Sequence, residues 1–127
     1  MAYDSQFQGV LSFPADIDLS GFQFYPVAIT TAGRLTTIGS TATKPIGVLQ
    51  DTPDAAGVIG SVVISGVSKC AAYTGAINVN DALGVSTSSL AEVTTTDNRW
   101  IIGRALETQA DAGVNAVITI EVNVGRY

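Results

Sequence analysis

The stretch NAVITIEVNV, residues 115–124, decides the fold class of this chain. Its apolar residues recur at every second position, and five of them share one face: Ala116, Ile118, Ile120, Val122 and Val124. Polar residues occupy the other face, with Val117 as the exception. Successive side chains of a β-strand point to opposite faces, whereas a helix repeats every 3.6 residues. The stretch therefore predicts a strand with one buried side.

A second stretch, SVVISGVSK at residues 61–69, is apolar on both faces around Val62, Val63 and Ile64. A strand of this kind needs cover on each side, so we expect it to be central in the sheet or to lie under a neighbouring subunit. The same logic predicts six weaker strands: FYPVAIT (24–30), RLTTI (34–38), PIGVLQ (45–50), AINVN (76–80), ALGVST (82–87) and RWIIGRALE (99–107). Because Pro26 has no N–H to donate, the first of these is expected to be an edge strand or to bend.

Turn signals separate the predicted strands at short intervals, among them Thr31-Ala32-Gly33, the loop 51–57 and Asn80-Asp81. The sequence gives little support for α-helices, and we allow only one short helical turn, at residues 88–92. Short strands with this punctuation are typical of an all-β fold, a small barrel or sandwich. A length of 127 residues predicts one domain, and we place this single β-domain at residues 21–127.

The first twenty residues differ from the rest because they show no alternation and yet are rich in apolar side chains. Five of these are candidate contact residues: Phe7, Val10, Leu11, Phe13 and Ile17. A disordered tail is normally short of aromatic residues. We therefore predict an extended N-terminal arm over residues 1–20 that lies either on its own domain or on a partner; both alternatives stay open.

The composition is unusually poor in charge. Charged residues make up 13% of the chain and hydrophobic residues 46%, against about a quarter charged in ordinary soluble domains. We infer that sister subunits or a larger assembly cover part of the surface, the alternative being an apolar monomer. The net charge is −5, and the six basic residues are scattered, so nucleic acid and anionic membranes are excluded as partners.

Catalytic chemistry finds little support. The sequence has no histidine to serve as a base, and Cys70 is its only cysteine, expected to be a buried structural thiol. The acid pairs Asp16/Asp18 and Asp51/Asp54 are expected to cap turns rather than to hold a metal ion. We expect no enzyme activity, no cofactor and no metal. The N-terminus lacks the pattern of a signal peptide, which predicts a soluble protein made in the cytoplasm.

Glycines inside the predicted strands indicate shape. Gly47 and Gly103 each follow an isoleucine and precede a leucine, and Gly66 and Gly84 occupy similar places. Glycine weakens a strand unless the backbone bends there or another backbone approaches closely. We therefore predict that these glycines, Gly47, Gly66 and Gly103 above all, are structural.

The order of the motifs carries a resemblance to a known family. Five stretches follow one another: VAITTAGRL (27–35), PIGVLQD (45–51), SVVISGVSK (61–69), INVNDALGVS (77–86) and IIGRALET (101–108). This succession, over roughly residues 25–124, resembles the head decoration, or capsid cement, proteins of tailed bacteriophages. One departure is the pair Asn80-Asp81, where the family tends to have Gly-Asp; asparagine also tolerates left-handed geometry, so the turn can survive.

The resemblance implies a β-tulip-like barrel and a protein without enzyme activity that binds the outer surface of the mature phage head, usually as a homotrimer. It would bridge subunits of the major capsid protein and stabilise the head. The partners implied are the major capsid protein and further copies of this chain. Two other classes stay open: another virion part, such as a tail or fibre subunit, and a carbohydrate- or receptor-binding module that would use Trp100 as its aromatic platform.

Overall fold

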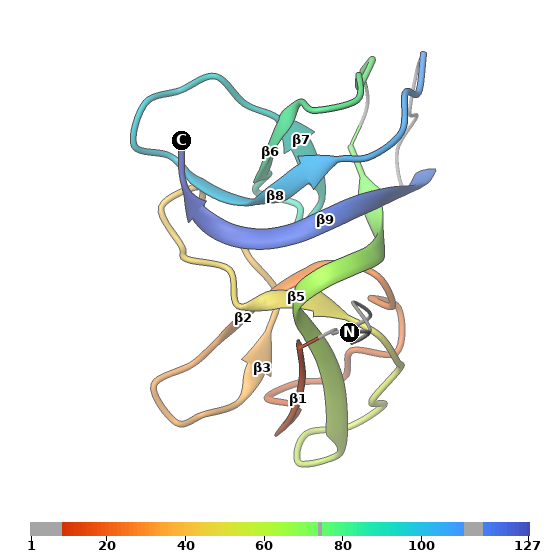
Figure 1. Ribbon diagram of the computed structural model, residues 1–127. Coiled ribbons are helices and arrows are strands. Elements are labelled where there is room, and N and C mark those ends of the chain that lie inside the picture. Colours follow the sequence, from red (N-terminus) through yellow and green to blue (C-terminus); the bar gives the residue numbers. More distant parts are fainter. Residues whose placement is uncertain (1–8, 74, 111–115) are drawn as a thin grey trace, which may run out of the picture.

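The computed structural model of the chain describes residues 9–73, 75–110 and 116–127, and the regular elements of these residues are all β-strands (Figure 1). The strands are β1 Gly9–Pro14, β2 Pro26–Ile29, β3 Leu35–Thr36, β4 Gly47–Leu49, β5 Ile59–Ala72, β6 Ala82–Val85, β7 Ala91–Val93, β8 Trp100–Ala105 and β9 Ala116–Arg126. The predicted all-β fold is confirmed. The strand predicted from NAVITIEVNV is also confirmed, since Ile118, Ile120 and Val122 are buried in β9.

The long strand β5 joins two groups of strands, and Figure 1 shows it running from the lower group to the upper one. Its first half pairs antiparallel with β1 and β4, and its second half pairs with β9 over eight residue pairs, from Ser65 to Ala72. Gly66 lies near the point where β5 changes its pairing from β1 and β4 to β9. Its φ of 104° is a backbone conformation that residues with a Cβ rarely adopt. The predicted structural role of Gly66 is thus explained by a backbone conformation that favours glycine.

The upper group closes into a barrel. β9 pairs with β8, β8 with β6 and β6 with β7, all antiparallel, and β7 returns to β5 through a parallel contact between Ala91 and Ala72. The lower group continues from β5 through β4 and β2 to β3, with β1 on β5 as well. The result is a small barrel that shares one strand with a smaller sheet.

Two hydrophobic cores explain why β4 and β5 are apolar on both faces. Val48 and Val63 belong to the core of the barrel, whereas their neighbours Leu49 and Val62 belong to a second core under the lower strands. All four side chains are buried, and each fully buried aliphatic side chain stabilises the fold by about 1.5–3 kcal/mol. The expectation that residues 61–69 form a central strand is confirmed.

Close backbone approach accounts for two further glycines. A Cβ on Gly47 would overlap the carbonyl oxygen of Val63 in β5, and one on Gly103 would overlap the carbonyl oxygen of Glu121 in β9. Only a residue without a side chain lets these strands lie so close, which gives a physical reason for glycine at both positions.

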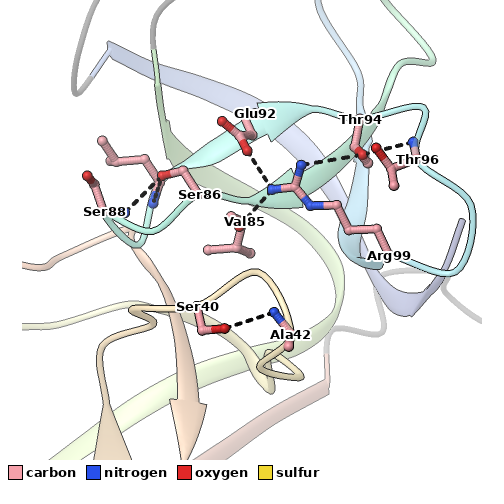
Figure 2. Close-up of polar contacts among 10 residues, drawn as sticks. Ser40, Ala42, Val85, Ser86, Ser88, Glu92, Thr94, Thr96 and Arg99 are labelled. Atoms are coloured by element: carbon pink, nitrogen blue, oxygen red, sulfur yellow. Dashed lines mark hydrogen bonds and ion pairs between the residues drawn. The ribbon is translucent and has the colours of Figure 1, made fainter.

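A polar clamp ties β6, β7 and the start of β8 together (Figure 2). The Arg99 guanidinium donates to the carbonyl oxygen of Val85 at 2.9 Å and forms an ion pair with Glu92, and these side chains are only 15% and 26% exposed. Gly84 makes room for the clamp, since a Cβ there would lie 2.8 Å from Arg99 Nε.

One predicted strand was wrong, and the helical turn that the sequence allowed at 88–92 does not form. AINVN forms no strand, and only Ile77 bridges to Gln109, because the Asp81 carboxylate accepts from Asn78 N at 2.8 Å and Asn80 turns the chain with φ of 78°. Residues 88–92 form no helix; Ser86 Oγ accepts from Leu90 N, and the chain turns into β7.

The described part of the predicted N-terminal arm lies on its own domain. Residues 9–14 form β1, and the side chains of Ala15 and Leu19 belong to the second core. The second core therefore contains residues from the predicted arm (1–20) as well as from the β-domain predicted at 21–127.

Candidate functional site

β1 is an edge strand with exposed apolar side chains. It pairs with β5 from Gly9 opposite Ser65 to Pro14 opposite Ile59, and no other strand of the described chain pairs with it. Val10 and Leu11 are 48% and 45% exposed, which is unusual for aliphatic residues within a strand. An unpaired edge of this kind is open to pairing with another chain.

More apolar side chains gather where β1 ends. Ala15 N donates to Val58 O and Gly57 N donates to Ala15 O, both at 2.8 Å, so the bend after β1 is fastened to the turn before β5. Ile17, on that bend, and Ile59, opposite Pro14, are 42% and 58% exposed. We call the five exposed aliphatic residues of this region the contact surface: Val10, Leu11, Ile17, Val58 and Ile59.

Three of the five candidate contact residues predicted from the sequence are exposed in this region, namely Val10, Leu11 and Ile17, and Val10 and Leu11 lie on opposite faces of β1. Phe13 instead packs, half-buried, against the second core. Phe7 lies outside the described residues. The exposure of Val58 and Ile59 was not predicted from the sequence. The sequence did hold one signal for it: the two aliphatic residues are adjacent and follow a glycine. Successive side chains of a strand point to opposite faces, so only one of the two can face a given core.

A groove opens beside β1 on the face of the second core. Its volume is about 530 Å³, and we define it by its eight lining residues: Leu11, Ile29, Lys44, Pro45, Ile46, Ile64, Asn123 and Val124. Ile46 and Ile64 also pack against the second core, so the groove is an open flank of that core.

Two cations lie over the aromatic ring of Trp100, the ring on which a bound sugar would have to stack. Lys44 Nζ lies 5.2 Å from the centre of the Trp100 ring and the Arg126 guanidinium carbon lies 4.1 Å from it. Each contact is a cation–π interaction. Trp100 is thus engaged within its own chain rather than displayed as an open aromatic platform.

The acidic and thiol candidates have structural partners. The Asp18 carboxylate accepts from Ser20 N at 2.9 Å, which lowers its pKa, and Asp51 accepts from Ser61 N at 3.1 Å. Cys70 is buried, and burial raises the pKa of its thiol. Within residues 9–73, 75–110 and 116–127, no cluster of three side chains suited to a metal ion occurs. The same residues include no helix long and apolar enough to cross a membrane.

The fold is similar to that of a solved phage protein. The N base of the head fiber protein gp8.5 of bacteriophage phi29, known from a crystal structure, superimposes with a TM-score of 0.67. The match covers 92% of this chain and 95% of that chain at 16% sequence identity. The sequence matches no protein-family model and no curated protein. At this level of identity the likeness is one of fold.

Proposed function

We propose that this chain is a structural protein of a tailed-phage particle that attaches to the head and acts by contact alone. The observation that carries the proposal is the likeness, over nearly the whole of both chains, to the base of a phage head fiber. The order of the sequence motifs points to phage heads as well. The absence of histidine from the sequence and the burial of the only thiol support a role without catalysis or cofactor.

The finer proposal is a decoration protein. The chain binds the outer surface of the mature head as a homotrimer and bridges subunits of the major capsid protein. The contact surface supplies apolar area, since each aliphatic side chain removed from water contributes about 25 cal/mol per Å² buried. Three weak sites on one trimer bind together, so linkage multiplies their strength. The free edge of β1 offers a place where a capsid strand can add to the sheet.

A second candidate is the base of a head fiber. It is favoured by the solved structure that this fold resembles, which is the N base of a phage head fiber. A fiber base carries a further fiber segment away from the head, whereas a decoration protein lies on the head alone. Electron microscopy of whole particles separates the two, because density that projects beyond this fold indicates a fiber.

Binding to purified heads of the phage that encodes the chain tests the proposal. We expect Val10→Lys combined with Ile59→Lys to weaken binding by at least tenfold with unchanged folding, because both positions are exposed. Val79→Lys with Val93→Lys is the matched control, since these valines are 52% and 39% exposed and lie outside the contact surface. Equal binding by both variants would count against the contact surface, and no binding by the wild type would reject the proposed function.

The N-terminal residues require a separate variant. Deletion of residues 2–18 would remove β1 and Ala15, a core residue, and would test folding instead of contact. Deletion of residues 2–8 leaves β1 intact and shows whether this segment, which includes Phe7, contributes to head binding.

A further inference from the structure

The groove beside β1 combines a mostly apolar lining with one cation, Lys44, that has no acidic partner among the described residues. Ile29, on its wall, is 37% exposed, and its volume of about 530 Å³ falls in the range of about 300–1,000 Å³ typical of binding pockets. Lys44 lines the groove and shares the Trp100 ring with Arg126. Among the described residues neither cation has an acidic partner, whereas Arg99 and Arg104 both form ion pairs.

The occupant that fits such a groove is a protruding apolar side chain flanked by carboxylates. The chain itself displays one. On the bend after β1, Ile17 is 42% exposed and stands between Asp16 and Asp18, which are both exposed. Neither carboxylate forms an ion pair with any described residue.

Two other exposed aliphatic residues of the described chain stand next to an acid, and in both cases the acid is already engaged. Val93 follows Glu92, which is paired with Arg99 in the clamp. Leu106 precedes Glu107, whose carboxylate accepts from Thr119 N at 2.9 Å. On the bend at residues 16–18 the Asp18 carboxylate also accepts from a backbone N–H, that of Ser20, but no described residue donates to the Asp16 carboxylate. Ile17 also has an acid on each side, whereas Val93 and Leu106 have only one. Charge complementarity therefore selects the bend at residues 16–18.

We propose that the groove of one copy of this chain binds the Asp16–Ile17–Asp18 bend of a second copy. Ile17 packs on the apolar floor, and the two carboxylates approach Lys44 and Arg126. Because groove and bend are different surfaces, the contact is head-to-tail, and repetition of it leads to a closed ring if the rotation between copies allows closure. The inference rests on the proposed function and deepens it: Leu11 and Ile17 belong to the contact between copies, and Val10, Val58 and Ile59 are left for the contact with the head.

Complementary variants test the contact in purified protein by native mass spectrometry and sedimentation velocity. We expect Ile17→Asp, which breaks the bend, and Ile29→Asp with Lys44→Glu, which breaks the groove, each to reduce the protein to monomers. A mixture of the two is expected to form a dimer and nothing larger, because one intact bend and one intact groove are left in each pair.

Charge reversal gives a second readout. Lys44→Glu alone is expected to weaken self-association about fivefold, in keeping with about 1 kcal/mol for an exposed ion pair. Adding Asp16→Lys to the same chain is expected to restore most of the loss. Lys69→Glu is the matched control for Lys44→Glu, because Lys69 is a cation without an acidic partner that lies outside the groove. Leu106→Asp is the matched control for Ile17→Asp, because Leu106 is an exposed aliphatic residue beside an acid that lies outside the bend.

Two results would overturn the inference: a wild type that is monomeric at concentrations on the order of 100 μM, or an oligomer that survives both broken variants. In the second case the homotrimer of the proposed function still stands with another interface. Neither result bears on binding to heads, which is measured separately.

Discussion

Replacing Gly47 by alanine tests the packing of the fold at a point where two strands lie unusually close. The new Cβ would overlap the carbonyl oxygen of Val63 and lie 2.7 Å from Val62 Cγ1, so β4 must move away from β5. Backbone atoms cannot turn aside as a flexible side chain can. The two strands pair through only two residue pairs, and both cores meet at this place.

The magnitude follows from two contributions. Overpacking of a close-packed site costs about 1–3 kcal/mol, and each weakened ladder hydrogen bond adds about 0.5–1.5 kcal/mol. We therefore expect Gly47→Ala to lower the free energy of unfolding by about 3 kcal/mol. For a chain of 127 residues this corresponds to a fall in Tm of roughly 10 °C.

Urea denaturation followed by circular dichroism measures the change directly. Gly125→Ala in β9 is the matched control, because a Cβ there meets nothing within 4 Å, and we expect stability to stay within about 0.5 kcal/mol or to rise slightly. A Gly47→Ala protein as stable as the wild type would refute the reasoning that close backbone approach fixes glycine at this position.

Further predictions concern single side chains. Arg99→Ala should destabilise the fold by about 2 kcal/mol in the same assay, because it leaves the partly buried Glu92 unpaired; a loss below about 0.5 kcal/mol would contradict the clamp. Arg126→Ala should shift the fluorescence emission of Trp100, the only tryptophan, and cost about 0.5–1 kcal/mol; an unchanged spectrum would argue against the cation–π contact. Burial raises the pKa of Cys70 above its unfolded value, so the thiol ionises in the unfolded chain first and stability should fall as pH rises above about 9; Cys70→Ala should flatten that decline. The Ser20 N–H lowers the pKa of Asp18, and NMR titration should therefore place its midpoint below that of an ordinary aspartate.

Much of the fold could be predicted from the sequence because alternation reports burial directly. β9 has one buried face, and β5 has two, as the patterns at 115–124 and 61–69 require. The spacing between glycine and its neighbours also pointed to Gly47 and Gly103, although it could not identify the carbonyl groups that approach them. β1 and β7 escaped prediction because β1 is largely exposed and β7 is only three residues long, so neither carries a period-two pattern.

The candidate site was only partly predictable. The apolar residues of the first twenty positions indicated a contact role, but whether they are exposed depends on pairing with β5, which is distant in sequence. The pairing leaves Val10 and Leu11 exposed and turns Phe13 toward the second core. The groove could not be predicted at all, since it is lined by residues from five separate segments between Leu11 and Val124.

Cryo-electron microscopy of phage heads mixed with this chain is the sharpest test of the proposed attachment. We expect density for this fold on the outer surface of the head, with the contact surface around Val10 and Ile59 buried against another protein. Heads without such density, or copies in which the contact surface faces solvent, would contradict it.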